Sequence, residues 1–302
     1  MRKSVLVTGA TGFIGSNLVE SLIKNNHSVS SLVRKGKSGH DKSKVILGDL
    51  TDKKIEFGDE QYDCIFHLAS HTPLEKNKKI VHKVNLEGTK NLFNQIKENT
   101  KSFLYVSGLG VYGDTGDKTV DESFPYCPTT EFVKTRLEAQ KFLETSCNEL
   151  GIGFSVVHFG DVYGSGGWFY KFLIKRLLKN TFRLPKGGDY YKGFVHIDDA
   201  VGSLVSILEK NAMNDSFIVA DSLPTKFKEF VNLTADYIGV RHPGNVPLFL
   251  AKAVLGTDLI KLLTTSMIVS NKKISKIYDF KFPTYKEGIP KVILDLKSKN
   301  LL

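Results

Sequence analysis

The sequence predicts an α/β fold, a doubly wound parallel sheet of the Rossmann type followed by a smaller, mostly helical C-terminal lobe. Short β-branched runs alternate with helical patterns through the first half of the chain, which is typical of βαβ units. A glycine-rich turn follows the first of these runs, and the alternation ends after about Gly164. We therefore expect one domain over residues 1–165, with strands from about 193–222 returning to it, and a smaller lobe over 166–302.

Each expected strand is a short run rich in Val, Ile, Phe or Tyr. Six such runs cover residues 4–7, 28–33, 44–47, 64–69, 102–107 and 154–159, and a seventh at 217–220 is expected to rejoin the same sheet. Helical patterns cover 13–25, 80–98, 131–149 and, in the lobe, about 168–180. Strands joined through helices form right-handed crossovers, so we expect a parallel sheet whose ligands lie beyond the carboxyl ends of the strands.

Composition excludes several classes of protein. The chain has 302 residues, 41% of them hydrophobic, which is enough for a well-buried core. Its three cysteines include no CxxC pair, so we expect neither a disulfide framework nor a metal site, and a cytoplasmic location fits best. The N-terminal "MRKSVLVTGA" has too short an apolar run for a signal peptide.

The most apolar stretch, "VPLFLAKAVLGTDLIKLL", is broken by Lys252, Asp258 and Lys261, so no transmembrane segment is expected. We interpret it as a packed amphipathic helix, with contact to a membrane surface as the alternative. The formal charge of +10 suits an anionic partner. Because the lysines are scattered and form no block interleaved with aromatic residues, nucleic acid is an unlikely partner by the basic-patch criteria.

A glycine motif predicts a dinucleotide site in the first domain. "LVTGATGFIG" sets three glycines directly after a strand and at the start of a helix. Glycines let the backbone turn tightly and approach a pyrophosphate, and the helix N-terminus offers free N–H groups. The residues expected at this turn are Gly9, Thr11, Gly12, Phe13, Ile14 and Gly15.

The end of the second strand favours NADP over NAD, with NAD as the alternative. About 20 residues past such a motif, NAD-specific proteins place an acid on the ribose 2′-hydroxyl. This chain has "LVRKGK" there, so Arg34 can pair with a 2′-phosphate through its planar fork and Lys35 adds charge.

Several further motifs, in a consistent order, resemble the extended (atypical) short-chain dehydrogenase/reductase family of NAD(P)-dependent epimerase/dehydratase type. They are "TGATGFIG", "GDL" at 48–50, "HLAS" at 67–70, "NLEGT" from Asn85, "GVYG" at 110–113, "DVYGSGG" from Asp161 and "FVHIDDA" from Phe194. The resemblance covers nearly the whole chain and implies an NAD(P)-binding Rossmann domain with a substrate or lid lobe. It implies further cofactor contacts from Asp49, Leu50, Leu68, Ala69, Ser70, Asn85, Arg136 and Gly160.

The resemblance also indicates an altered catalytic site. In that family a tyrosine, a lysine four residues later, and a serine or threonine three residues before "VYG" handle the substrate oxygen and its proton. Matching "PTTEFVKTRLEAQ" to this pattern puts Phe132 and Arg136 at the first two positions and Gly108 at the third. Phenylalanine has no proton to give, whereas arginine keeps a cation that can hold ribose hydroxyls. Alternative donors nearby in motif terms are Ser107, Tyr112, His158, Asp161 and Tyr163.

Two functional interpretations stay open at this point. One is an enzyme, an NADPH-dependent reductase or a nucleotide-sugar-modifying enzyme with a displaced proton donor; the other is a non-catalytic dinucleotide-binding sensor or scaffold. Aromatic residues at 168–170 either line a substrate pocket or belong to the core. Cations at Lys175, Arg176, Lys179, Arg183 and Lys192 either attract a phosphorylated or nucleotide-sugar substrate or form a solvated face. Members of the family often pair as homodimers through the helix that begins near Phe132.

Overall fold

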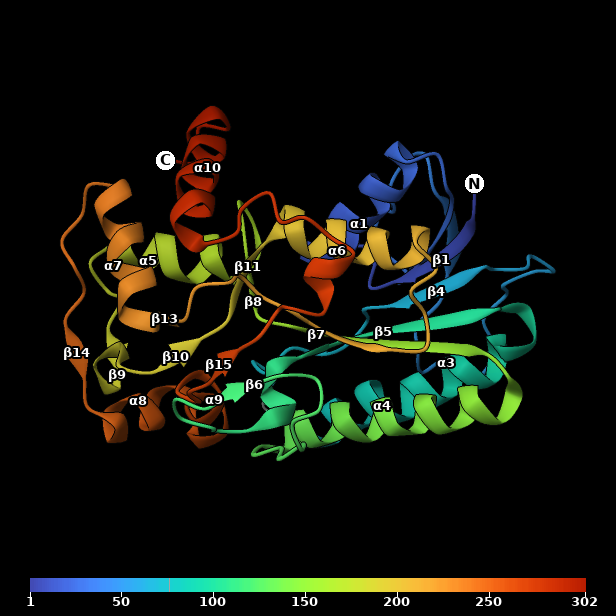
Figure 1. Ribbon diagram of the computed structural model, residues 1–302, viewed down its shortest axis with the longest axis horizontal. Coiled ribbons are helices and arrows are strands. Elements are labelled where there is room, and N and C mark those ends of the chain that lie inside the picture. Colours follow the sequence, from blue (N-terminus) through green and yellow to red (C-terminus); the bar gives the residue numbers. More distant parts are fainter. Residues whose placement is uncertain (76) are drawn as a thin grey trace. The chain divides into compact units, whose positions relative to one another are not determined.

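The computed structural model describes residues 1–75 and 77–302, and its main element is a seven-stranded sheet (Figure 1). The strand order is β12-β7-β5-β4-β1-β2-β3, and the ladders from β3 through β2, β1 and β4 to β5 are all parallel. The predicted Rossmann-type α/β fold is therefore confirmed. The strands are β1 (Ser4–Thr8), β2 (Ser28–Val33), β3 (Lys44–Leu47), β4 (Cys64–His67), β5 (Ser102–Gly108), β7 (Gly153–Phe159) and β12 (Ser216–Val219).

The central strands are buried on both faces, as their continuous apolar runs require. In β1, Val5, Leu6 and Val7 are fully buried. Figure 1 shows α1 (Phe13–Lys24) and α6 (Ile197–Glu209) over one face of the sheet and α3 (Gly88–Ile96) and α4 (Glu131–Leu150) over the other. Helix α4 turns Val133, Leu137, Ala139, Leu143 and Cys147 inward, so this layered core holds the carboxyl edge of the sheet in place.

The helical pattern at 80–98 is not one regular α-helix. It consists of α2 (Lys78–His82), a π-helical turn η1 (Lys83–Glu87), α3 and a short 3-10 turn (Lys97–Asn99). A π-turn widens the helix by one residue and occurs often at functional sites. Here it carries Asn85, which the motif order had already marked.

The chain divides into two compact units. The first combines Met1–Val111, Glu131–His158 and Val201–Phe217, and the second combines Tyr112–Thr130, Phe159–Ala200 and Ile218–Leu302. Eight further short strands lie in the described part of the second unit: β6 (Thr119–Val120), β8 (Asp161–Tyr163), β9 (Leu184–Pro185), β10 (Tyr191–Lys192), β11 (Phe194–His196), β13 (Thr225–Lys226), β14 (Asn245–Val246) and β15 (Ile268–Val269). Its helices are η4 (Phe169–Ile174), α5 (Lys175–Leu178), α7 (Phe227–Tyr237), α8 (Leu248–Leu255), α9 (Thr257–Leu263) and α10 (Tyr285–Ser298).

The second unit has its own aromatic core. The rings of Phe194 and Phe230 stack with centroids 3.9 Å apart, and Tyr163 and Phe169 pack around Phe230. Of the strands expected to return to the main sheet, β12 does so beside β7, whereas β11 pairs in parallel with β8. The separate core explains why this part of the chain forms a unit of its own.

Candidate dinucleotide site and catalytic positions

The turn between β1 and α1 is built so closely that only glycine fits it. Gly9 has a φ of +69°, and its carbonyl accepts a 2.9 Å hydrogen bond from the Gly12 amide. A Cβ on Gly15 would lie 2.1 Å from the Gly9 oxygen, and a Cβ on Gly9 would lie 2.8 Å from the Ala69 nitrogen. The backbone of the turn therefore packs against both its own helix and the end of β4.

The N-terminus of α1 suits an anionic group. The helix begins after Gly12, and no side chain caps it through a hydrogen bond or places an acid in its first turn. The first amides of a helix have no partner inside the helix and carry partial positive charge. A turn kept free of side chains, followed by such a helix end, fits the pyrophosphate of a dinucleotide.

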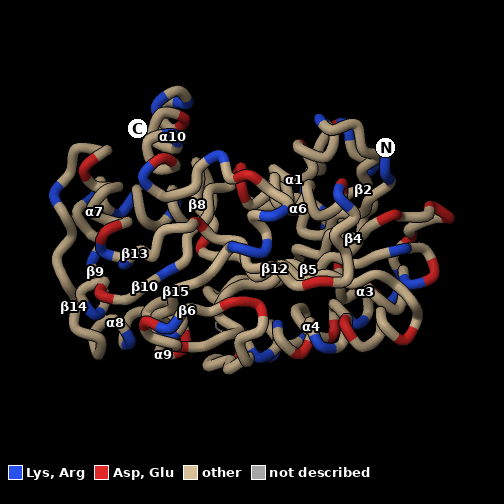
Figure 2. Tube along the Cα trace, viewed as in Figure 1, with Lys and Arg blue, Asp and Glu red and all other residues tan. Residues whose placement is uncertain are grey.

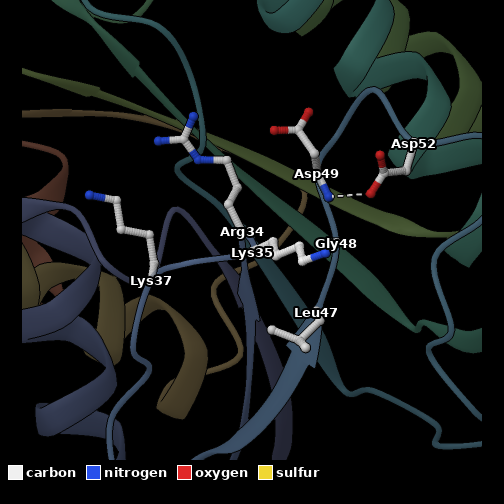
Figure 3. Close-up of a pocket in the computed structure, with 7 residues that line it drawn as sticks. All are labelled: Arg34, Lys35, Lys37, Leu47, Gly48, Asp49 and Asp52. Atoms are coloured by element: carbon white, nitrogen blue, oxygen red, sulfur yellow. Dashed lines mark hydrogen bonds between the residues drawn. The ribbon is translucent and has the colours of Figure 1, made fainter.

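An open hollow of ≈ 680 Å³ lies beyond the ends of β2 and β3 (Figure 3). Figure 3 shows the side chains of Arg34 and Asp49 extending to the same side of the backbone, with Lys37 on the other side of Arg34 from Asp49. The lining residues are Arg34, Lys35, Lys37, Leu47, Gly48, Asp49 and Asp52. The lining therefore combines three cations with two carboxylates. Both carboxylates follow β3, and the end of β2 contributes only cations to the hollow.

Asp49 is held in one orientation by its neighbours. Its carboxylate accepts hydrogen bonds from the Thr51 amide (2.9 Å) and hydroxyl (2.8 Å), while its own amide donates to Asp52 (2.7 Å). Burial raises the pKa of Asp49, but the Thr51 hydrogen bonds and the charge of Arg34 outweigh it and hold the pKa below its usual value. The next residue, Leu50, is buried in the core and packs against Gly88.

His67, at the end of β4, holds the strand ends together as a neutral ring. The Thr89 hydroxyl donates to the Asn85 carbonyl (2.8 Å), so it accepts from His67 Nε2 (2.8 Å). His67 Nδ1 is then free of hydrogen and accepts from the Thr8 hydroxyl (2.7 Å), which also receives the Ala69 amide (3.2 Å). Burial, with a contribution from the charge of Arg136, lowers the pKa of His67 to about 3.

Asn85 also reaches the segment after β4. Its side-chain oxygen accepts from the His71 amide at 2.7 Å, and its Nδ2 is buried with no hydrogen-bond partner among the described residues. The turn η1 that carries it packs against α4. Residues 68–71 are thus fixed from two sides, by the Thr8–His67 pair and by Asn85, with Leu68, Ala69 and Ser70 partly exposed.

Arg136 and Phe132 lie at the first turns of α4, against the end of β5. Arg136 Nη2 donates to the Val106 carbonyl. The guanidinium carbon lies 5.4 Å from the Tyr105 ring centroid and 6.0 Å from that of Phe132, and the Tyr105 hydroxyl donates to the Arg136 carbonyl at 3.4 Å. A partly buried cation is therefore held by two aromatic rings and one backbone oxygen.

Ser107 carries a hydroxyl on the strand that Arg136 contacts. It is 5% exposed, and its Oγ has no hydrogen-bond partner among residues 1–75 and 77–302. Side chains two residues apart on a strand share a face, so Ser107 faces the same side of β5 as Tyr105, whose ring contacts Arg136. Gly108 brings no side chain to the edge. The carboxyl end of β5 therefore presents the Ser107 hydroxyl and the Arg136 guanidinium, while the nearby Tyr105 phenol is buried and donates to the Arg136 carbonyl.

The other candidate donors are deeply buried or paired. His158, hydrogen-bonded to Gln140 at 3.0 Å, has its pKa lowered to about 3 by burial, with a smaller effect from Arg136. In the second unit, Tyr112 is 1% and Tyr163 0% exposed, and burial raises the pKa of both phenols. Asp161, which follows Gly160, lies 3.6 Å from the Lys192 ammonium.

Residues 168–170 divide between the core and its margin. Phe169 is fully buried, Trp168 donates from its ring nitrogen to the Val162 carbonyl at 2.8 Å, and the Lys175 ammonium lies 5.0 Å from the Tyr170 ring centroid. Lys175, Arg176, Lys179 and Arg183 are exposed. Figure 2 shows basic and acidic residues interspersed along the chain without a continuous basic stripe.

No group of three or more His, Cys, Asp or Glu side chains in residues 1–75 and 77–302 could hold a metal ion. In the same part of the chain, no helix is long and apolar enough to cross a membrane.

Comparison with known proteins gives the family. The model of the NAD dependent epimerase/dehydratase family matches residues 5–220. The chain belongs to this family. It is 26% identical to a 3-diazoavenalumate denitrifying reductase from a Streptomyces species, over 94% of this chain and 98% of the relative. It is 25% identical to a putative UDP-glucose 4-epimerase of Methanocaldococcus jannaschii, over 78% of this chain and 83% of the relative.

Among solved structures, the human epimerase family protein SDR39U1 with NADPH has a TM-score of 0.82 and 22% identity, over 97% of this chain and 100% of that chain. At that identity the likeness shows the fold alone, and it agrees with the strand order described above.

Four residues that hold the family positions in place had not been marked by motif. Tyr105 supports Arg136, Gln140 pairs with His158, and Thr8 and Thr89 hold the two sides of His67. Strand geometry could have placed Tyr105 on the same face of β5 as Ser107, since the two lie two residues apart. The two threonines give no such signal, because a threonine in a strand or helix is most often explained by propensity or local hydrogen bonding.

Proposed function

We propose that the first unit binds a nicotinamide dinucleotide along the carboxyl edge of its sheet. The observation that carries this proposal is the contact of Gly15 with the Gly9 oxygen, where a single methyl group would collide at 2.1 Å. A turn without side chains lets a phosphate group approach the backbone amides of the helix N-terminus. The pyrophosphate would lie at Gly9 to Gly15, the adenosine near Asp49, and the nicotinamide ribose near Arg136.

We propose that NADP(H) binds more tightly than NAD(H). Arg34, Lys35 and Lys37 line the hollow beside the end of β2, where an NAD site needs an acid. Asp49 reduces the local positive charge, but its carboxylate is engaged by Thr51. The Arg34 fork can therefore pair with a 2′-phosphate.

We propose that the protein is a reductase or a nucleotide-sugar-modifying enzyme in which proton transfer no longer depends on the family's tyrosine. The dinucleotide, when bound, supplies or accepts a hydride. Phe132 has no proton to exchange with the substrate, and the Arg136 guanidinium offers hydrogen-bond donors but no acceptor. The groups left at this edge are the Ser107 hydroxyl and the Arg136 guanidinium, which can polarise a carbonyl oxygen by hydrogen bonding. Reduction of a reactive acceptor with a proton from water fits such a site better than reversible epimerisation.

The second candidate is a dinucleotide sensor or scaffold without turnover. This candidate is favoured by the contacts of Arg136. Its guanidinium already donates to the Val106 carbonyl and lies against the rings of Tyr105 and Phe132, which leaves fewer donors for a substrate. In both candidates the 166–302 lobe supplies the surface that recognises a substrate or partner, and α4 is the helix through which two copies would pair. The two relatives are named as a reductase and a putative epimerase, which supports the enzyme candidate.

Calorimetric titration of the purified protein with NADPH and NADH tests the cofactor proposal. NADPH should bind about ten times more tightly or better, and Arg34→Ala should remove most of that preference, because one bidentate charged contact contributes about 1.5–3 kcal/mol. Lys24→Ala, an exposed cation on α1 paired with Glu20, is the matched control and should change neither affinity. Equal affinities for the two dinucleotides in the wild type would overturn the NADP preference, and no binding of either would overturn the dinucleotide site.

A further inference from the structure

The α8–α9 hairpin of the second unit carries large apolar side chains on its outer surface. Phe249 is 70% and Val254 73% exposed, and Leu250 is 47% exposed. The hairpin is anchored to the unit by other residues, since Ala251 and Ile260 are buried. Phe249, Leu250, Ala253 and Val254 follow the i, i+1, i+4, i+5 spacing of one broad helix face. The sequence alone had suggested that this face would be packed, and the structure leaves it exposed to solvent.

Cations surround this apolar face. Lys252 and Lys261 are on the hairpin itself and are exposed. Arg183 and Lys186 are brought beside its N-terminal end, because the Leu184 amide donates to the Gly244 carbonyl at 2.9 Å and β9 pairs with β14 directly before α8. Arg241 is exposed in the loop before β14.

The acidic residues of the same region do not cancel this charge. Asp258 is the only acid in the sequence from Pro243 to Met267. Asp236 is paired with His242 at 2.7 Å, and Asp114 reaches the far end of the hairpin, where it accepts from the Ser266 amide at 3.4 Å. The apolar face is therefore bordered mainly by positive side chains.

We propose that the α8–α9 hairpin docks the protein on an anionic phospholipid surface. Phe249, Leu250 and Val254 would enter the boundary between headgroups and acyl chains, and Lys252 and Lys261 would extend their ammonium groups to the phosphates. Each basic residue near an anionic leaflet contributes a modest attraction, and several are needed beside the apolar contact for measurable binding. A second copy of this chain on the same face would bring like charges together, which makes it the less suitable occupant.

This inference goes beyond the dinucleotide proposal and is tested separately from it. Sedimentation with sucrose-loaded vesicles of phosphatidylcholine containing about a third phosphatidylglycerol should recover bound protein, and vesicles of phosphatidylcholine alone should recover at least about tenfold less. Raising the salt concentration should weaken the binding, because exposed charges are screened.

The variant Phe249→Ser/Val254→Ser should lower the partition onto anionic vesicles by about tenfold or more, since two large apolar side chains no longer enter the lipid. The matched control is Val45→Ser/Leu294→Ser, which removes two exposed apolar residues (45% and 65%) elsewhere and should bind like the wild type. Phe249→Trp should add an emission component that shifts to the blue on anionic vesicles and is absent from the wild type, whose single tryptophan is Trp168.

Three results would overturn the proposal. They are no binding of the wild type to anionic vesicles, unchanged binding by Phe249→Ser/Val254→Ser with an unchanged circular dichroism spectrum, and a dimer in solution that this variant dissociates while vesicle binding stays absent. The last result would make a second copy the occupant of the face.

Discussion

The β1–α1 turn and the β5–α4 region belong to the same unit and face the same edge of one sheet, yet they keep the family pattern to different degrees. The first retains all three glycines, and the contacts at Gly9 and Gly15 leave no room for a Cβ. The second has Gly108, Phe132 and Arg136 where the resemblance called for a hydroxyl, a phenol and an amine. The binding geometry is thus a property of the backbone, and the proton chemistry is a property of a few side-chain atoms.

This difference has a physical cause. A side chain added at Gly15 meets backbone that cannot move without shifting β1 or α1, so the fold itself opposes the change. A phenylalanine in place of a tyrosine removes one oxygen and leaves the ring packing unaltered. Arg136 adds its own stabilising contacts with Val106 and Tyr105, so this region is well packed with Phe132 and Arg136 at these positions.

The largest effect is expected from a change in the glycine turn. Gly15→Ala should destabilise the protein by about 3 kcal/mol and lower dinucleotide affinity by about a hundredfold or more, because the added methyl would lie 2.1 Å from the Gly9 oxygen. Thermal unfolding and calorimetry measure the two effects. Gly244→Ala is the control, since its nearest neighbour would be an Arg183 carbon at 3.9 Å. If Gly15→Ala had effects as small as those of Gly244→Ala, the claim that the backbone at the β1–α1 turn excludes a side chain would be wrong.

A smaller loss is expected where β1 meets β4. Thr8→Val would leave His67 Nδ1 and the Ala69 amide without the hydroxyl that now pairs with them. We expect a loss of about 2 kcal/mol in the free energy of unfolding, measured by urea titration. Thr8→Ser keeps the hydroxyl and should recover most of the loss, and equal losses in the two variants would show that the methyl group matters rather than the hydrogen bonds.

The buried histidines predict how stability depends on pH. Free imidazole in the unfolded chain takes up a proton near pH 6.5, whereas His67 and His158 do so only near pH 3 in the folded state. Between these values the unfolded state binds more protons, so stability should fall as the pH falls, by up to about 1.4 kcal/mol per pH unit for each histidine.

His158→Gln removes one of these groups while keeping a hydrogen-bonding side chain opposite Gln140. Urea unfolding of wild type and variant at about pH 7 and about pH 5.5 should show a smaller pH effect in the variant, and groups common to both proteins, such as Asp221, cancel in the difference. Identical pH effects would contradict the lowered pKa of His158, because they would mean that it binds protons equally in the folded and unfolded states.

The smallest effect is expected beside Arg136. Tyr105→Phe removes a hydroxyl whose hydrogen bond to the Arg136 carbonyl is long, at 3.4 Å, so stability should change by less than about 1 kcal/mol. Tyr105→Leu also removes the ring that lies 5.4 Å from the guanidinium and should cost about 1 kcal/mol more. A larger effect for Tyr105→Phe, measured by thermal unfolding, would assign the support of Arg136 to the hydroxyl instead of the ring.

The sequence predicted the sheet because its cues are local. The apolar run of β1, the glycines after it and the helical period of 131–149 each constrain a few neighbouring residues, and the strands lie within one or two residues of their expected positions. The glycine turn was predictable for the same reason. The π-turn at Asn85 was not, because one extra residue in a helical turn leaves the apolar period almost unchanged.

The surroundings of the catalytic positions could not be predicted in this way. The contact of Tyr105 with Arg136 joins residues 31 apart, and the burial of Tyr112 and Tyr163 depends on packing that no motif records. The exposure of Phe249 and Val254 is a further case, since an amphipathic pattern does not say whether its apolar face has a partner. The motifs identified the candidate residues by their position in the sequence. Which of these side chains are buried, paired or without a hydrogen-bond partner depends on tertiary packing.

The comparison of the two regions is tested most directly by restoring the family's side chains at one of them. NADPH oxidation should be measured for the wild type and for Gly108→Ser/Phe132→Tyr/Arg136→Lys against a panel of keto-sugar nucleotides and simple ketones, with NADPH affinity measured on the same samples. We expect both proteins to bind NADPH and the variant to turn over at least one substrate about 10²–10⁴-fold faster, the usual contribution of general acid–base catalysis. A wild type with ordinary turnover, on the order of 1–10³ per second, and no gain in the variant would contradict the account, because another group would then already supply the proton.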